Sequence, residues 1–536
     1  MHPRRTRGIH EIRDFDREIL LCPEKNHIGT PIGLFLRFRN RDYDEYNLPM
    51  RTYRTTILSD TVYFSADSGS RSKRMDDTRT QATPAFNNGP IRLSAFRILT
   101  VVLLSAILTS SSSFAQDWVR TGSGLGVEKV RLAVPDFKPA NNDPQNSALL
   151  KTFNDTFWND LDNSGVVELV TKSFYPLQIP GQPTEITFGL WSSPPPNAAM
   201  LAFGNLGVAA GRVTVQGWLY DVKNTASPQV LGKQYADAAT DDATRVIAHK
   251  FADEIIFRLG GGIPGIAESK IYYVSDRSGH KEIWMMDYDG ANQRQLTHQN
   301  AISLSPRISP DGSRLAFSSL TKTGWDILMF STDLNRGVSF PRFGGTNLAP
   351  SWSPDGTHLA LSSSHSGESE IYVCDANGAN LRRMTDNRGP DVSPSWNRKT
   401  GAQIAFVSGR TDLPQVYTME ADGTNQQRMT DQGYAVSPNW SPNGQFLALA
   451  WIRKYGPGAP GASDIYLMDI ASKQWVQLTH DGGRNDFPWW APDGRHIVFQ
   501  SSRSGKEEIW MMLADGAKLH QLTFTGRNSQ PNWSWK

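Results

Sequence analysis

Cysteine is nearly absent from this 536-residue chain, which holds only Cys22 and Cys374. A strong charge of one sign is also lacking, because 55 basic and 53 acidic residues leave a net charge of +2. Such a balance argues against nucleic acid as a partner. The length suggests several domains, and the content of 38% hydrophobic and 20% charged residues is ordinary for a globular protein.

No long hydrophobic run follows the chain start. The most apolar stretch, 98–108, has eleven residues, whereas a membrane span takes about 20. Two arginines precede this stretch, and a serine-rich segment ending in Ala115 follows it. This is the order of a secretory signal peptide. We therefore expect residues 92–115 to be a signal that is cleaved after Ala115, so that the processed protein does not span a membrane.

Residues 1–91 contain none of the 16 tryptophans and no clear periodicity. We interpret them as a leader outside the working protein, with the true start lying downstream, for example at Met75. The alternative is a long cytoplasmic tail on an uncleaved anchor. Removing residues 1–115 changes the net charge to about −3 and leaves Cys374 alone, so no internal disulfide is possible. We expect Cys374 to be a small buried residue.

Tryptophan recurs at nearly fixed intervals in the second half of the chain. Spacings of 44, 44, 44, 50 and 43 residues separate Ile308, Trp352, Trp396, Trp440, Trp490 and Trp533. A period of this size is typical of repeat architectures. Each unit holds four short runs rich in β-branched and aromatic residues, with Gly, Asp and Asn between them, which predicts four antiparallel strands. Units of this size with four strands are typical of propeller blades.

The strand count predicts how the ring closes. The second run of a unit appears first at Ile271 with no first run before it, and a first run appears last at Gln530 with no second run after it. We therefore expect six blades over residues 263–536, with the C-terminal strand completing the blade that begins at Ile271. The repeated tryptophans are expected to pack between blades. We expect the prolines that precede them to begin the first strand, where no ladder donor is needed, namely Pro306, Pro350, Pro394, Pro438, Pro488 and Pro531.

Residues 116–262 alternate between strand and helix patterns, which predicts a small α/β domain. Apolar residues at four-residue spacing indicate an amphipathic helix over 147–164, and a second helix over 241–259 begins with two acidic residues and ends before Gly260. Residues 212–222 and 230–236 resemble a hairpin pair. The proline-rich loop 179–197 is expected at the surface. Residues 122–126 are interpreted as part of a flexible N-terminal arm.

Several motifs together resemble the TolB family, the soluble periplasmic components of the Tol-Pal system. They are the signal, Val-Pro-Asp-Phe at 134–137, Ala-His-Lys-Phe-Ala-Asp-Glu-Ile at 248–255, the strand 269–276 directly after it, and the Ser-Pro-Asp-Gly turns. The resemblance covers residues 116–536. One departure is that 203–222 looks shorter than the family norm. The resemblance implies a monomeric periplasmic protein that supports outer-membrane integrity and constriction during cell division.

No catalytic, metal or cofactor signature is found. A Gly-x-Ser-x-Gly elbow is missing, and the glycines at 122–126 precede a strand instead of following one, so they are no dinucleotide fingerprint. The acidic run at Asp287 resembles a calcium loop, but equivalent residues in other units mark it as a turn. We therefore expect a binding protein and no enzyme.

The loops at one end of the channel vary between units, and variable loops on a rigid scaffold are where recognition is expected. Three residues before each repeated proline lies a residue that is polar in five of six units, including Asn347, Asp391, Asn485 and Asn528. These side chains either line the mouth for a peptide or cap loop backbone, and the pattern leaves both open.

The resemblance implies that a Pal-like lipoprotein binds this mouth and that a TolA-like inner-membrane protein binds the N-terminal arm. Our candidate contacts are Arg342, Phe343, Asn347, Asp391 and Val392 at the mouth. Trp118 is the candidate in the arm. Two rivals remain, namely an exported propeller that binds a sugar or another small ligand, and an enzyme with an unrecognised site.

Overall fold

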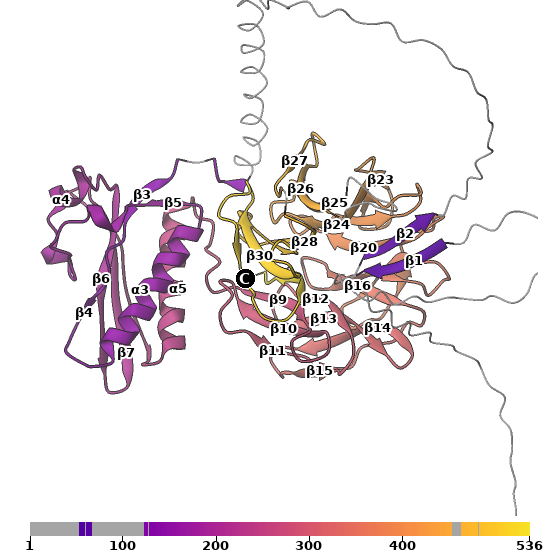
Figure 1. Ribbon diagram of the computed structural model, residues 1–536, viewed down its shortest axis with the longest axis horizontal. Helices are drawn as coiled ribbons and strands as arrows, with labels where there is room; N and C mark the ends of the chain where they lie inside the picture. Colours follow the sequence, from indigo (N-terminus) through magenta and orange to yellow (C-terminus); the bar gives the residue numbers. More distant parts are fainter. Residues whose placement is uncertain are drawn as a thin grey trace, which may run out of the picture.

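The structure is a computed structural model that describes residues 53–58, 61–66, 123–126, 128–452, 462–480 and 482–535. An α/β domain lies beside a six-bladed β-propeller (Figure 1). The predicted fold class is therefore confirmed. The predicted signal peptide, its cleavage site and Trp118 lie outside the described residues.

Within residues 1–91, the structure describes one antiparallel hairpin, formed by β1 (Tyr53–Leu58) and β2 (Thr61–Ala66). β2 contacts β20 of the propeller (Figure 1). The interpretation of this segment as a leader stays a prediction.

The α/β domain is built on one mixed sheet with strand order β5-β3-β6-β7-β8, and β4 pairs with β6. β3 is parallel to β5 and β6, whereas β6, β7 and β8 form an antiparallel meander. The strands are β3 (Val130–Ala133), β4 (Lys138–Pro139), β5 (Val167–Leu169), β6 (Met200–Ala209), β7 (Arg212–Asp221) and β8 (Gln229–Ala238).

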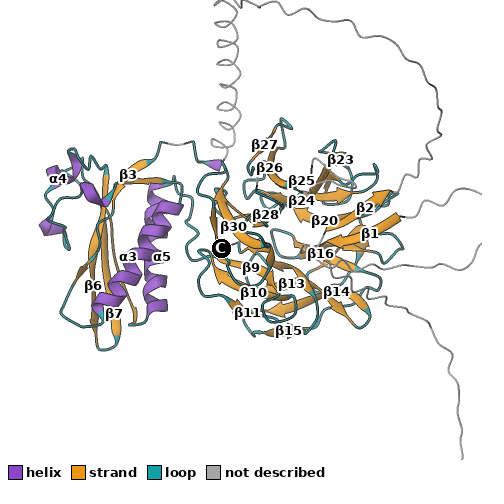
Figure 2. Cartoon of the chain, viewed as in Figure 1, coloured by secondary structure: helices purple, strands orange, loops and turns teal. Residues whose placement is uncertain are grey.

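Both long helices cover one face of this sheet, at the positions that the sequence predicts (Figure 2). They are α3 (Asn146–Asn163) and α5 (Asp241–Leu259). The Thr240 side chain accepts a hydrogen bond from the Ala243 N–H and caps α5. Phe157 of α3 and Phe251 of α5 stack with ring centroids 5.1 Å apart. The apolar faces of the helices thus form the core of the domain.

Residues 172–197 cover part of the opposite face of the sheet. They include η2 (Lys172–Phe174), η3 (Pro183–Glu185) and the short helix α4 (Phe188–Ser192). Trp191 is 1% exposed and packs with Phe203 and Tyr220. The expectation of a simple surface loop is wrong at this residue, because its ring fills the space above the sheet.

Strand β6 has no counterpart among the sequence predictions, because Gly204 and Gly207 interrupt its apolar pattern. A Cβ on Gly204 would lie 2.3 Å from a ring carbon of Phe137, and one on Gly217 of β7 would lie 2.6 Å from Phe251. The glycines therefore let aromatic rings approach the sheet backbone. β6 and β7 are each ten residues long, and the comparison of 203–222 with the family norm stays a prediction.

The propeller consists of six four-stranded sheets, numbered here as blades 1 to 6. The bounds in blades 1 to 3 are β12 (Ser303–Ile308), β13 (Arg314–Thr321), β14 (Gly324–Ser331), β15 (Arg336–Val338); β16 (Asn347–Trp352), β17 (His358–Ser363), β18 (Glu370–Asp375), β19 (Arg382–Arg383); β20 (Asp391–Trp396), β21 (Gln403–Ser408), β22 (Gln415–Glu420), β23 (Gln427–Arg428). Those in blades 4 to 6 are β24 (Tyr434–Trp440), β25 (Phe446–Ile452), β26 (Asp464–Asp469), β27 (Trp475–Gln477); β28 (Asn485–Trp490), β29 (His496–Ser501), β30 (Glu508–Leu513), β31 (His520–Gln521); β32 (Asn528–Trp533), β9 (Lys270–Ser275), β10 (Glu282–Asp287), β11 (Arg294–Gln295).

The C-terminal strand closes the ring as the strand count predicts. β32 pairs antiparallel with β9, with Asn532 opposite Tyr272 and Trp533 opposite Ile271. Blade 6 therefore joins the two ends of the propeller sequence. This pairing leaves no open sheet edge between blade 5 and blade 1.

The repeated tryptophans lie between blades, which confirms their predicted role. Trp396 of blade 3 packs with Ile371 and Val373 of blade 2, and Trp440 of blade 4 packs with Val416 of blade 3. Trp440, Trp490 and Trp533 are fully buried. The period of the sequence thus reflects one buried ring in almost every gap between neighbouring sheets.

The repeated prolines do not begin their strands, so that prediction is wrong. The innermost strand of each blade begins about three residues earlier, and the proline lies in a β-bulge, as between Leu304 and Arg307. The residue before each proline has a φ of +51° to +54°. A bulge leaves residues unpaired in the ladder, so a residue without an N–H is tolerated there.

Candidate functional site on the loop face of the propeller

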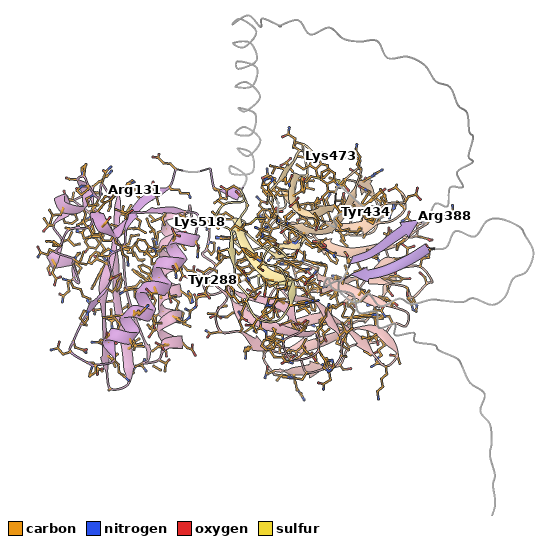
Figure 3. All side chains as sticks on the ribbon, in the orientation of Figure 1. Arg131, Tyr288, Arg388, Tyr434, Lys473 and Lys518 are labelled. Carbon is orange, nitrogen blue, oxygen red and sulfur yellow. The ribbon has the colours of Figure 1, made fainter. Side chains whose placement is uncertain are left out.

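The two ends of the propeller differ in what they carry. The turn face holds the turns between first and second and between third and fourth strands, and the loop face holds the remaining connections. Residues of α3 and α5 contact Asp289, His496 and Lys518, which all belong to the turn face. Figure 3 shows Tyr288 and Lys518 beside the α/β domain and Arg388 at the opposite end. The α/β domain thus covers part of the turn face.

A buried polar triad joins the two domains. Asp160 of α3 accepts a hydrogen bond from the Tyr288 hydroxyl of the propeller and lies 2.7 Å from Nδ1 of His249 in α5. All three side chains are buried. Burial alone would lower the pKa of His249, but the hydrogen bond to Asp160 and the negative charges of Asp160 and Asp289 together outweigh burial and raise that pKa.

A second buried group holds the same junction. His496 of β29 places Nδ1 2.7 Å from Asp493 and Nε2 2.8 Å from the Asn163 carbonyl oxygen. Burial alone would raise the pKa of Asp493, but His496 and Arg495 outweigh it and hold that pKa at about 2. His496 therefore contacts both Asp493 of its own blade and the C-terminal end of α3.

The N-terminal arm ends at this junction. Leu125 is 4% exposed and belongs to a core cluster that includes Leu513 of the propeller. The described end of the arm, residues 123–126, is therefore anchored by a buried leucine, and the prediction of a flexible arm is wrong there. Trp118 lies outside the described residues.

On the loop face, the polar residues three positions before the prolines are buried. Asn347, Asp391, Asn485 and Asn528 are each 0% exposed. Asn347 accepts a hydrogen bond from the hydroxyl of Ser363, the last residue of β17, and donates one to the Gly344 carbonyl oxygen in the loop before β16. These residues therefore cap loop backbone and fix strand ends. Their predicted contact with a partner stays a prediction.

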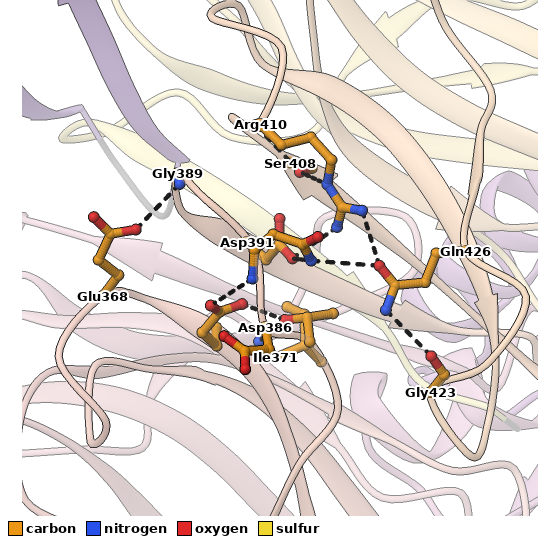
Figure 4. Close-up of polar contacts among 12 residues, drawn as sticks. Glu368, Ile371, Asp386, Gly389, Asp391, Ser408, Arg410, Gly423 and Gln426 are labelled. Atoms are coloured by element: carbon orange, nitrogen blue, oxygen red, sulfur yellow. Dashed lines mark hydrogen bonds and ion pairs between the residues drawn. The ribbon is translucent and has the colours of Figure 1, made fainter.

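Asp391 is the centre of an ionic cluster in blade 3 (Figure 4). Its Oδ2 accepts hydrogen bonds from Arg410 Nη2 at 2.9 Å and from Asn387 Nδ2 at 3.2 Å. Burial raises the pKa of Asp391 above its ordinary value, and the nearby Glu370 carboxylate adds to the rise. Arg410 and Ser408 oppose it. The cluster ties the loop before β20 to the connection after β21.

A repeated clamp supports the loops, and sequence reasoning missed it. The side chain of the first residue in the third strand accepts a hydrogen bond from the hydroxyl of a threonine fifteen positions later. The same hydroxyl accepts a hydrogen bond from the backbone N–H of the second residue in that strand. In five of the six units these residues lie in the third and fourth runs at a fixed spacing of fifteen, which was the usable signal. The pairs are Glu282 with Thr297, Glu370 with Thr385, Gln415 with Thr430, Asp464 with Thr479 and Glu508 with Thr523.

The remaining predicted mouth residues differ in exposure. The Arg342 side chain is 57% exposed, and its Nη1 donates to the Thr323 hydroxyl at 2.9 Å. Phe343 is half-buried and packs edge-on against Phe340 with centroids 5.8 Å apart. Val392 is buried. Of the predicted contacts that the structure describes, Arg342 and Phe343 therefore present surface to a partner.

Bulge residues and prolines of the innermost strands line an axial cavity. Its walls include Ala349, Ser393, Ser437 and Phe487, each with a positive φ, together with Arg307 and Trp489. Among the described residues, no cluster of three or more metal-ligating side chains is found. No helix in the described part of the chain is long and apolar enough to span a membrane.

Comparisons with known sequences connect these features to one family. Residues 258–456 and 431–536 match the TolB beta propeller domain, which is more than half of the chain, and residues 123–227 match the TolB amino-terminal domain.

Among curated relatives, a protein TolB homolog of Chlorobium chlorochromatii (strain CaD3) is 34% identical over 210 residues, which are 39% of this chain and 46% of that protein. The Tol-Pal system protein TolB of Desulfosudis oleivorans (strain DSM 6200 / JCM 39069 / Hxd3) is 32% identical over 294 residues, covering 54% and 65%. The chain spans about half the length of the curated relatives it matches.

Among solved structures, TolB from Acinetobacter baumannii superposes with a TM-score of 0.64 at 23% identity, over 76% of this chain and 97% of that one. This likeness shows that the fold is shared.

Proposed function

Because the chain belongs to the TolB family, we propose that it acts in the periplasm as a non-enzymatic component of the Tol-Pal system and binds a Pal-like lipoprotein on the loop face. The observation that carries this proposal is the contrast between the two ends of the propeller. The α/β domain contacts the turn face, whereas Arg342 and Phe343 on the loop face present surface. Rigid support under varied loops suits recognition of a folded partner.

The N-terminal arm is the second proposed binding element. Leu125 fixes its described end beside blade 5, and Trp118 precedes this end in the sequence. We propose that the arm binds a TolA-like inner-membrane protein. Engagement of both partners would support outer-membrane integrity and constriction during division.

Calorimetry with purified proteins tests the binding proposal. The chain, purified from the periplasm, is titrated with the soluble domain of the Pal-like lipoprotein from the same organism. We expect Arg342→Ala combined with Phe343→Ala to weaken binding at least tenfold, about 1.4 kcal/mol, since a few anchors dominate most interfaces. Lys399→Ala on the turn face is the matched control and should leave the affinity unchanged.

Two results would contradict the proposal. One is an equal loss of affinity in the loop-face and turn-face variants. The other is no heat with the lipoprotein domain but clear heat with a glycan, which would favour the rival function of small-ligand binding.

A further inference from the structure

Three blades carry an arginine at the same position of the loop face, two residues after the second strand. Its Nε donates a hydrogen bond to the serine that ends this strand, and its guanidinium lies over an aromatic ring of the third strand. The arginines are Arg277 in blade 6, Arg410 in blade 3 and Arg503 in blade 5. All three are half-buried. The repeat therefore places guanidinium groups at equivalent points around the loop face.

The three arginines differ in the charge of a second partner, which lies in the innermost strand. In blade 3, Arg410 Nη2 is 2.9 Å from Oδ2 of the Asp391 carboxylate (Figure 4). In blades 5 and 6 an asparagine amide oxygen takes the place of that carboxylate. The bonds join Arg503 to Asn485 at 3.0 Å and Arg277 to Asn528 at 3.2 Å. An amide oxygen accepts a hydrogen bond but carries no charge, so only the arginine of blade 3 is neutralised by its partner.

Arg277 contacts no carboxylate within the described residues. Its guanidinium donates hydrogen bonds to neutral oxygens alone, those of Ser275, Tyr273, Gln293 and Asn528. The acidic groups near this loop have other partners, because Glu508 lies 2.9 Å from Lys506 Nζ and Asp276 accepts the Arg527 N–H. The charge of Arg277 thus stays without a counterion in contact.

Arg503 is in a similar state. Its Nε and Nη2 donate to Ser501 and Asn485, which are both neutral. Asp464 is separated from it by Asn485, whose Nδ2 lies 3.2 Å from Asp464 Oδ1. Burial lowers the pKa of Arg503, and the opposing charge of Asp464 only partly offsets this. The guanidinium has therefore lost water without gaining a carboxylate, a state that an incoming carboxylate would relieve.

Both arginines also keep unused donors. A guanidinium has five N–H donors, and the hydrogen bonds within the described residues use two in Arg503 and four in Arg277. Blades 5 and 6 are neighbours, since β28 and β29 contact β32. Blade 1 lies on the other side of blade 6 and leads into the loop with the exposed Arg342. The two arginines therefore share one arc of the loop face with this loop.

We propose that Arg277 and Arg503 bind carboxylate side chains of an acidic surface on the lipoprotein that docks on the loop face. Binding at these residues presupposes the proposed function and adds the chemistry of the partner surface. A planar guanidinium suits a carboxylate because it can donate two parallel hydrogen bonds to its two oxygens. Arg503 has enough unused donors for this arrangement, and Arg277 has one. Opposite charges on the two surfaces would also speed their encounter.

The sharpest test gives blades 5 and 6 the carboxylate of blade 3. Asn485→Asp combined with Asn528→Asp leaves both arginines in place but neutralises them, as Asp391 neutralises Arg410. Calorimetry with the soluble domain of the Pal-like lipoprotein should show binding at least tenfold weaker. The loss should shrink as the salt concentration rises, because salt screens exposed charges.

Lys399→Met is the matched control, because it removes an exposed positive charge from the turn face. It should leave the affinity and its salt dependence unchanged. Arg277→Gln combined with Arg503→Gln covers the case in which the aspartate variant does not fold. Glutamine keeps an N–H donor for each asparagine but carries no charge, so this variant should show the same salt-dependent loss.

The outcomes separate this proposal from lipoprotein binding itself. If the unchanged chain binds the lipoprotein domain and the charge variants bind it equally well, the arginine proposal is overturned and the proposed function stands. A loss that is the same at every salt concentration would also overturn it, since a purely structural defect behaves in that way. No heat with the unchanged chain would contradict the proposed function and the arginine proposal together.

Discussion

The turn face and the loop face belong to the same six blades, yet they are built in opposite ways. The turn face repeats short Asp-Gly and Asn-Gly turns, and the α/β domain contacts it through charged and polar pairs on blades 5 and 6. The loop face varies in sequence, while buried clamps such as Glu370 with Thr385 repeat beneath it. Repetition therefore marks the scaffold of this protein, and variation marks the surface available for recognition.

Of the two faces, the loop face should show the larger loss of folding stability when one buried carboxylate is removed. Asp391→Ala leaves Arg410 without its buried partner and should lower the free energy of unfolding by about 3 kcal/mol, the low end for a broken buried pair. The arginine is 18% exposed and keeps its bonds to Ser408 and Gln426, which limits the loss. Urea unfolding measures the change.

Asp391→Asn is the matched variant. It keeps an acceptor oxygen for Arg410, and the raised pKa of Asp391 indicates that a neutral group is tolerated there. We expect it to cost clearly less than the alanine variant. Equal losses for both would mean that the loop face does not depend on this ion pair.

The turn-face junction is tested by Tyr288→Phe, which removes one hydrogen bond to the buried Asp160 carboxylate. A buried charged acceptor left short of a donor should cost about 2 kcal/mol. Tyr220→Phe is the control, because that hydroxyl bonds at 3.2 Å to the exposed Gln229 side chain. Urea unfolding of both variants should give a larger loss for Tyr288→Phe. A larger loss for Tyr220→Phe would contradict the role of the triad as a link between the domains.

A further prediction concerns the pH dependence of the junction. Asp253 accepts backbone N–H bonds from Ala267 and Glu268, and burial raises its pKa to about 7. An unfolded aspartate has a pKa of about 3.9. Between about pH 4 and pH 7 the Asp253 carboxyl is therefore protonated in the folded state and ionised in the unfolded state. Stability from this group therefore falls as pH rises from about 4 to 7 and stays level above.

Asp253→Asn should flatten that fall in the free energy of unfolding, measured by urea titrations across pH 4.5 to 8. The exposed Asp237→Asn should follow the unchanged chain. Parallel curves for Asp253→Asn and the unchanged chain would contradict the prediction, because they would show that the pKa of this carboxyl is the same in the folded and unfolded states.

The sequence predicted features that follow from period and amphipathic pattern. Six blades, the closing strand at Trp533 and both helices of the α/β domain were predictable, because buried faces impose regular spacing on the chain. β6 was not, since Gly204 and Gly207 serve a neighbouring ring and break the apolar pattern. The prolines were misplaced because a bulge with a positive φ at a non-glycine residue leaves no local signal.

The candidate site was harder to predict than the fold. Asn347 and Asp391 were found by their position in the repeat, but whether a polar side chain points into a channel or into its own blade depends on partners such as Ser363 and Arg410. Which face the α/β domain covers depends on Asp160, His249 and Tyr288, which are distant in sequence.

Hydrogen–deuterium exchange of the protein, with and without the soluble domain of the Pal-like lipoprotein, tests the division between the two faces most directly. We predict slower exchange on binding in residues 339–346 and 386–390 of the loop face. The exchange rates of residues 287–293 and 491–496 on the turn face should stay unchanged, because the lipoprotein does not contact them. Protection confined to the turn-face segments would contradict the account.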